Sequence, residues 1–265
     1  MRRSTVFWGS ILILIGVLLL LDNVLAIDVG DLIWPLVLIA LGLWILWGVL
    51  AGRGSIEAEE ATIPLEGAGQ ARVRIHHGAG RLRLDSSAGP GELATGTFGG
   101  GLDYRVSREG DTLDVLMRMP RSFPPFAVPW MWGPGRTLDW SFGLNSQIPL
   151  SLDFEIGAND ARLDLTGLRV TDLRLQSGAS STDLKLPANA GHTQAVIKTG
   201  AASVTVHVPS GVAARIRTSG GLASIQVDRD RFPKTGGVYQ SPDYDTATNK
   251  VDIDIDVGVG SVSIR

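Results

Sequence analysis

The sequence predicts a mainly β fold, a β-solenoid of roughly 21-residue coils that follows an N-terminal two-helix transmembrane hairpin. Two observations predict it. Uncharged apolar segments dominate the first 55 of the 265 residues, and one glycine-centred pattern recurs through the rest. The hydrophobic share of 44% and the mean hydropathy of +0.17 are high for a chain that lies wholly in water. We therefore divide the chain into residues 1–55, a membrane anchor, and residues 56–265, a β-domain.

The two apolar segments have the length and composition of membrane-spanning helices. They cover residues 6–21 and 32–51, and neither contains a charged residue. A helix needs about 20 apolar residues to cross roughly 30 Å of hydrocarbon. The linker between the segments contains three aspartates, each of which would cost on the order of 3 kcal/mol at the bilayer centre. The segments therefore predict a helical hairpin whose linker lies at the membrane surface.

Basic residues at the outer ends of the hairpin predict its orientation. Arg2 and Arg3 precede the first helix, and Arg53 follows the second. By the positive-inside rule, the N-terminus and the β-domain are then cytoplasmic, and the chain contacts membrane lipid through residues 6–51. The alternative is a secretory signal peptide that is cleaved after Ala26, because a small-residue cleavage site ends its apolar run.

A glycine flanked by alternating apolar residues recurs in one frame. Around Gly200, apolar residues lie three and five positions before the glycine and four, six and eight positions after it. Side chains two apart share a face of a strand, so each copy predicts a strand, a corner and a second strand. We expect glycine at the corner because tight coils need backbone angles that a Cβ disfavours. The predicted corners are Gly78, Gly157, Gly178, Gly200, Gly221 and Gly258.

The spacing of the glycines favours stacked coils. Four of them are separated by 21, 22 and 21 residues, a period typical of solenoids, whose coils bury an apolar face against their neighbours. An antiparallel sandwich would show similar alternation but gives no reason for a constant register. Insertions interrupt the register at about residues 86–149 and 229–250. The first insertion includes a predicted hairpin that turns at residues 109–111.

Composition and motif context argue against several kinds of site. The net charge of −3 provides no basic footprint for nucleic acid. The glycine corners are followed by strands and not by the helix of a phosphate-binding loop, so they predict no nucleotide cofactor. His76 and His77 are adjacent in a predicted strand and point to opposite faces, so they cannot share a metal. We interpret these two residues, His192 and His207 as solvated histidines.

Acidic residues offer the other candidate sites. Asp252, Asp254 and Asp256 share one face of a predicted strand, which would suit calcium, but a solvent-facing acidic strand that discourages edge-to-edge aggregation is the favoured interpretation. Scattered carboxylates on predicted strands would be needed for a polysaccharide-acting enzyme, and no pair of them recurs. We therefore predict a protein that is not an enzyme and has no metal or other cofactor.

A segment rich in proline and aromatic residues is the most distinctive candidate surface, at about residues 119–143. It either caps one end of the solenoid or docks a partner or the membrane surface, since Trp and Phe are enriched in such contacts. The partner-binding candidates are Phe123, Phe126, Trp130, Trp132, Trp140 and Phe142.

Two stretches resemble a known family. They are the hairpin, which contains FWGSILILIGVLLLLDNV, and IPLSLDFEIGANDARLDLTGLRVTDLRLQSGASSTDLKLP. Both are similar to LiaF-like proteins of the cell-wall-active-antibiotic response and to toast-rack, adhesin-like β-domains. The resemblance covers the hairpin and most of the chain after Leu144, and it carries no catalytic residues. It implies restraint of a sensor histidine kinase in envelope-stress signalling, although two predicted helices replace the usual four.

These observations lead to two principal functional hypotheses. The first is a membrane-anchored, non-enzymatic protein that binds a protein partner in the bacterial envelope-stress response, such as a sensor kinase in the same membrane. The alternative is a structural scaffold or adhesin-like module that associates with itself or with an envelope polymer. An exposed terminal coil and an extracellular domain would favour the alternative.

Overall fold

The structure is a computed structural model that describes residues 38, 42, 58–120 and 138–265. The predicted helices at residues 6–21 and 32–51 therefore lie outside the described residues, except for Leu38 and Gly42, which are both helical. Among the described residues, no helix has the length and hydropathy that crossing a bilayer requires.

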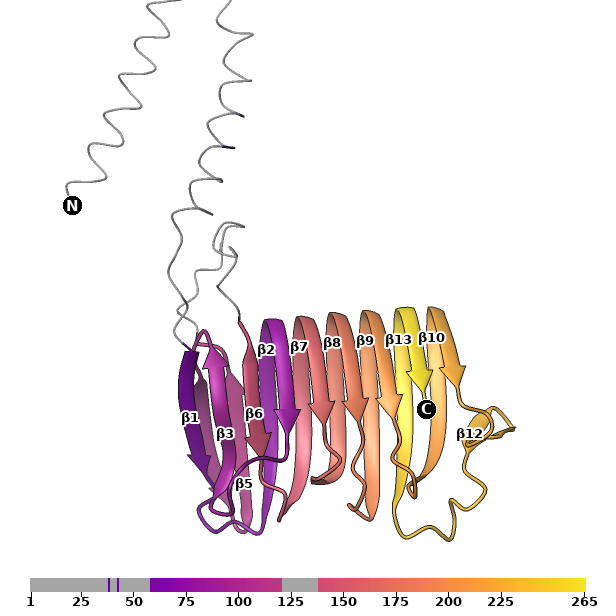
Figure 1. The fold of residues 1–265 in the computed structure, drawn as a ribbon, viewed down its shortest axis with the longest axis horizontal. Helices are drawn as coiled ribbons and strands as arrows, with labels where there is room; N and C mark the ends of the chain where they lie inside the picture. The colour runs from indigo at the N-terminus through magenta and orange to yellow at the C-terminus, as the bar shows by residue number, and fades with distance from the viewer. Residues whose placement is uncertain (1–37, 39–41, 43–57, 121–137) are drawn as a thin grey trace, which may run out of the picture. The chain divides into compact units, whose positions relative to one another are not determined.

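Strands dominate the described residues from Ala58 onward, which confirms the predicted mainly β class. They form one 13-stranded hydrogen-bonded sheet that folds over on itself (Figure 1). The strands are β1 (Ala58–Pro64), β2 (Gln70–Asp85), β3 (Glu92–Gly99), β4 (Asp103–Glu109), β5 (Thr112–Arg118), β6 (Trp140–Leu144), β7 (Pro149–Asp164), β8 (Arg169–Lys185), β9 (His192–His207), β10 (Ala213–Val227), β11 (Lys234–Thr235), β12 (Val238–Gln240) and β13 (Lys250–Ile264).

Six long parallel strands make the body of the β-domain. They lie side by side in the order β2, β7, β8, β9, β13 and β10 (Figure 1). Each strand runs along one face, turns at its glycine and continues on the opposite face, so each forms most of one coil. Short segments such as residues 165–168 lead from one strand to the next. The strands are thus held in a solenoid-like stack in which every inner strand has a neighbour on both sides.

The core lies between the two faces and consists of aligned rows of side chains. One row on the first face is fully in register and buried, and its members are Val73, Leu152, Leu173, Ala195, Ile253 and Ile216. Each apolar side chain therefore packs against its equivalents in neighbouring coils and against the opposite face. The predicted frame of alternating residues is confirmed.

Glycine occupies the corners for a reason that differs from the predicted one. None of the six corner glycines has a positive φ, so the prediction of special backbone angles is wrong. A Cβ at Gly157 would instead collide with the carbonyl oxygen of Gly78, and one at Gly258 would lie 2.7 Å from that of Gly200. Close stacking of one corner on the next excludes a side chain.

The first predicted insertion contains another coil. β5 pairs in parallel with the first half of β2, and β6 pairs with the second half, so that Val115 lies beside Val73 and Trp140 beside Leu82. Residues 112–118 and 140–144 therefore continue the register and do not interrupt it. The predicted hairpin is confirmed, since β4 and β5 are antiparallel and Gly110 takes a φ of 61° in their turn.

The last two coils do not follow the order of the chain. β13 pairs with β9 on one side and with β10 on the other, so it lies between two strands that precede it. Residues 228–249 form the long lateral segment that permits this return, and they carry the short hairpin β11–β12. As a result, β10 is the last of the long strands in space.

Candidate functional site

The aromatic residues predicted to bind a partner do not form one surface. Trp140 and Phe142 are buried in β6, with 0% and 3% of their surfaces exposed. The ring of Trp140 lies 5.2 Å from that of Phe98, edge to face. These two residues belong to the core of the split coil, so their assignment to a surface is wrong. Phe123, Phe126, Trp130 and Trp132 lie outside the described residues.

The histidines differ in their surroundings. His76 is half exposed and lies 3.4 Å from Glu155, whereas His77 is buried, so the two do point to opposite faces. The ring nitrogens of His77 lie 2.8 Å from Asn159 Oδ1 and 3.0 Å from the carbonyl oxygen of Leu138. Burial lowers the pKa of His77, although these two hydrogen bonds act in the opposite direction. The solvated interpretation is therefore wrong for His77, which is a core residue.

The acidic face of β13 is observed, but its predicted role is wrong. Asp252, Asp254 and Asp256 lie on the outer face of one strand, as expected. Since β13 is hydrogen-bonded on both sides, it has no free edge to protect. Asp254 instead accepts a hydrogen bond from Arg217 of β10 at 3.3 Å. Within the described ranges, no three His, Asp or Glu side chains are grouped as metal ligands.

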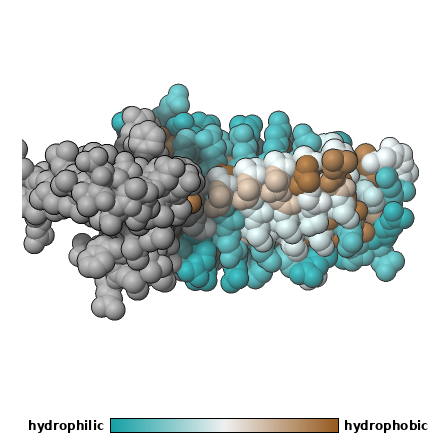
Figure 2. All heavy atoms as spheres, turned by 90° about the horizontal axis from the view of Figure 1, so that it is seen from above, coloured by the Kyte–Doolittle hydropathy of each residue, from teal (hydrophilic) through white to brown (hydrophobic). Residues whose placement is uncertain are grey.

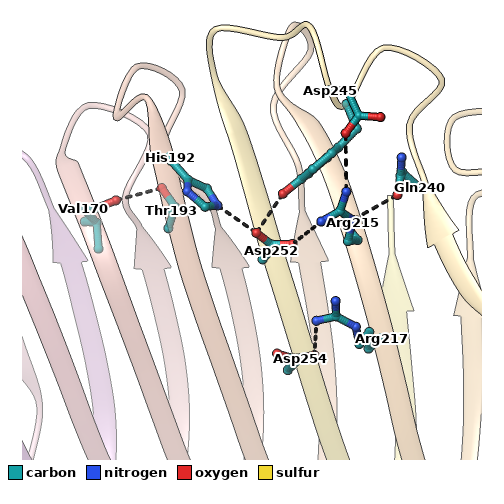
Figure 3. Close-up of polar contacts among 10 residues, drawn as sticks. Val170, His192, Thr193, Arg215, Arg217, Gln240, Asp245, Asp252 and Asp254 are labelled. Carbon is teal, nitrogen blue, oxygen red and sulfur yellow. Dashed lines mark hydrogen bonds and ion pairs between the residues drawn. The ribbon is translucent and has the colours of Figure 1, made fainter.

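A polar cluster centred on Asp252 ties the lateral segment to three strands (Figure 3). Tyr244 donates a hydrogen bond to Asp252 Oδ2 at 2.7 Å, and His192 Nε2 lies 2.7 Å from the same oxygen. Arg215 Nη1 lies 3.8 Å from the other oxygen, Oδ1. The guanidinium of Arg215 also lies 4.0 Å from the centre of the Tyr244 ring, and its Nε donates to Gln240. We call Tyr244, His192, Arg215 and Asp252 the clasp.

The electrostatics of the clasp favour an ionised carboxylate and a neutral phenol. Burial acts to raise the pKa of Asp252, but the hydrogen bonds from Tyr244 and His192 outweigh it and lower the pKa. Burial and the hydrogen bond to Asp252 raise the pKa of Tyr244 to about 12. Tyr244 is only 3% exposed. Tyr244 and His192 both contact the carboxylate of Asp252. The clasp therefore acts as a structural support that holds the lateral segment against the strands.

The corner row forms an uncharged strip along the β-domain. Residues that follow the corner glycines lie side by side on the surface: Ala79, Ala158, Ala179, Ala201, Val259 and Leu222. Figure 2 shows this pale to brown strip between teal, hydrophilic margins. An open groove of about 810 Å³ runs beside it, past Glu155, Lys198 and Asp256. The side chains of the strip become larger toward β10, where Leu222 is 82% exposed.

The second half of β10 forms an edge of the sheet. Its first half is covered by β12, which pairs with Arg215 and Ile216. In the part of the chain that the structure describes, no strand pairs with the outer side of residues 218–227. This stretch contains neither a charged residue nor proline. Such an edge invites pairing with another chain.

Sequence reasoning missed this edge, although part of the signal was present. The frame at Gly221 predicts Ile225 and Val227 as inward residues, and both do pack against the core while remaining partly exposed. The missing information is the position of β13, because the sequence alone places β10 between β9 and β13. The free edge therefore follows from topology and not from any motif.

Comparison with known proteins assigns the chain to a family. The family model for the N-terminal domain of toast_rack, DUF2154, matches residues 52–207, and the model for the LiaI-LiaF-like transmembrane region matches residues 6–46. A solved structure of a candidate cell adhesion protein from Clostridium sporogenes ATCC 15579 has a TM-score of 0.70 at 19% identity, over 78% of this chain and 98% of that one. No curated protein matches. With more than half of its length matched, the chain belongs to the toast-rack family as a LiaF-like member.

Proposed function

We propose that this protein is a membrane-anchored, non-enzymatic module that binds a protein partner in the bacterial envelope-stress response. The partner in this proposal is a sensor histidine kinase of the same membrane, which the bound protein restrains. The match of residues 6–46 to a LiaI-LiaF-like transmembrane region supports the membrane anchor. The observation that carries the binding role is the open, uncharged edge of β10, a surface whose backbone groups can accept another chain.

The test of this function measures both the contact with the kinase and the activity of the kinase. A photo-crosslinking amino acid replaces exposed Gln226 on β10 in the full-length protein, and the equivalent change at exposed Ser181 of the central strand β8 is the control. We expect a cross-linked product with the kinase from position 226 and not from position 181. In proteoliposomes, we expect kinase autophosphorylation to fall when the full-length protein is added. Unchanged kinase activity would refute the restraint.

The side of the membrane distinguishes this function from its alternative, an adhesin-like module that binds envelope polymer. The chain contains no cysteine, so Ser210→Cys provides a single thiol at an exposed position between β9 and β10. From Arg2, Arg3 and Arg53 we predict a cytoplasmic domain, so a membrane-impermeant maleimide should label this thiol only after permeabilisation. Labelling in intact cells would reverse the orientation and favour the adhesin-like module.

A further inference from the structure

The second half of β10 has one paired side and one open side. Asp228 N donates a hydrogen bond to Ile264 O of β13. Because peptide groups alternate in direction along a strand, the even-numbered residues 222–226 also face β13. The N–H and C=O groups of Ala223, Ile225 and Val227 therefore point to the open side. They offer three donors and three acceptors at the spacing of a β-ladder.

The same three residues complete an apolar inner surface. Their side chains pack against the core but are only partly buried, because no coil of the described ranges covers them from the open side. A strand added at this edge would place alternate side chains beside Ala223, Ile225 and Val227. The inward positions of that strand should be small or apolar, as in β8 and β9, and the outward positions polar.

The β11–β12 hairpin restricts what can reach the edge. It extends the first face by two strands beyond β10 (Figure 1). At about 4.8 Å per strand, the first face projects roughly 10 Å beyond the second. A second copy of the domain has two faces of its own, and its first face would meet this hairpin before the two edges came within hydrogen-bonding distance. A single extended segment has one layer and avoids the hairpin.

The size of the edge also favours a short segment. Residues 222–227, which follow the corner, span about 20 Å at roughly 3.3 Å per residue, and a ladder of that length covers on the order of a few hundred Å² on each partner. A stable dimer buries about 800 Å² per partner. The edge strip alone therefore falls short of what a second copy needs but is sufficient for β-strand addition by one peptide segment.

We propose that the open edge of β10 binds one extended, uncharged segment of a partner protein by β-strand addition. The segment alternates small or apolar residues with polar ones and pairs with Ala223, Ile225 and Val227. This inference rests on the proposed partner-binding function and names the chemistry of the partner at the contact.

The test uses full-length protein in nanodiscs and a defined probe. The probe is a fluorescein-labelled peptide with the sequence of residues 201–207, Ala-Ala-Ser-Val-Thr-Val-His, which has the required alternation in β9. Fluorescence anisotropy measures its binding. We expect Ala223→Pro to weaken binding about tenfold or more, because proline removes one outward donor and obstructs the ladder. Proline at this position leaves the hydrogen bonds to β13 in place.

A matched pair of lysine variants keeps the test valid if the proline variant does not fold. Ser224 and Ser181 lie in one row of exposed serines, in register through Ser203 and Ser261. Ser224→Lys places a charge at the open edge, and Ser181→Lys places the same charge in the middle of the sheet. We expect weaker peptide binding only for Ser224→Lys. Equal binding by both variants, or no binding to the wild type at millimolar peptide, would overturn the proposal.

The outcomes also separate this inference from the proposed function. If the kinase is restrained equally by wild type and Ala223→Pro, partner binding stands and the edge is the wrong site. If the peptide binds the edge but no kinase is cross-linked or restrained, the edge stands and the kinase assignment fails. If sedimentation shows a dimer of the full-length protein that Ala223→Pro dissociates, a second copy occupies the edge and the proposal is overturned.

Discussion

The two ends of the stack of coils protect their strand edges differently. At the end formed by β1 and β4, the edge strands are charged: β1 carries Glu59, Glu60 and Pro64, and β4 presents Arg105 and Arg108 among its exposed residues. At the other end, β12 covers the first half of β10 while the second half is uncharged and open. A stack of parallel coils must end somewhere, and charges, proline or an added hairpin ordinarily discourage further pairing. Among the described strands, the second half of β10 lacks all three, which is consistent with a role in binding.

The largest expected effect comes from the glycine row, in which Gly78 of β2 lies at one end and Gly157 of β7 follows it. A Cβ at Gly157 meets the backbone of the preceding coil, whereas one at Gly78 meets no atom of the described residues within 4 Å. We therefore expect Gly157→Ala to lower the free energy of unfolding by about 2–3 kcal/mol, and Gly78→Ala to change it by less than about 0.5 kcal/mol. Urea unfolding of the two variants measures both effects. Equal losses would show that corner stacking does not explain the glycines.

A smaller effect tests the clasp, which holds the hairpin side of β10. The pKa of Tyr244 is raised to about 12 in the folded protein, above the unfolded value of about 10. Its stabilising contribution is therefore fully present below pH 10 and is lost as the pH rises from 10 toward 12. We expect Tyr244→Phe to be less stable than the wild type at pH 8 by on the order of 2 kcal/mol.

Unfolding curves measured between pH 8 and pH 11.5 check this prediction. The stability difference between wild type and Tyr244→Phe should narrow as the pH rises through this range. A difference that is independent of pH would mean that the pKa of Tyr244 is not raised in the folded protein.

The smallest expected effect involves no change in stability. It is a difference in amide exchange rate along the open edge of β10. Amide hydrogen exchange should alternate along β10, with fast exchange at Ala223, Ile225 and Val227 and slow exchange at Ser224 and Gln226, whose amides face β13. NMR of the native protein resolves these positions. Slow exchange at all five would mean that the open side is already covered, and the contrast between the two ends would disappear.

The repeating register could be predicted because it depends on the spacing of apolar residues around each glycine, which the sequence shows directly. The glycine frame identifies six coil strands and their inward residues, including those of β10. The reason for the glycines could not be read from the sequence, since close stacking of Gly157 on Gly78 depends on the neighbouring coil and not on local backbone angles. The same local frame cannot tell which coil lies beside which.

The split coil and its buried aromatic residues could have been predicted, but the prediction relied on amino-acid composition and not on the alternation of apolar residues. Trp140, Phe142 and Leu144 alternate at the period of a strand and are all buried. The surrounding prolines and aromatics suggested a surface instead. Period-two alternation was the better guide, because it reports which side chains share a face whatever their size.

The position of β13 has a consequence for how the protein is made. β10 ends at Val227, and β13 begins only at Lys250, so translation completes β10 well before its permanent neighbour exists. β9 and β10 both pair with β13 in the same frame, so a nascent chain could join them directly. That premature pairing would have to reopen to admit β13. The last coil therefore cannot be added by simple growth along the chain, because β13 has to enter between β9 and β10.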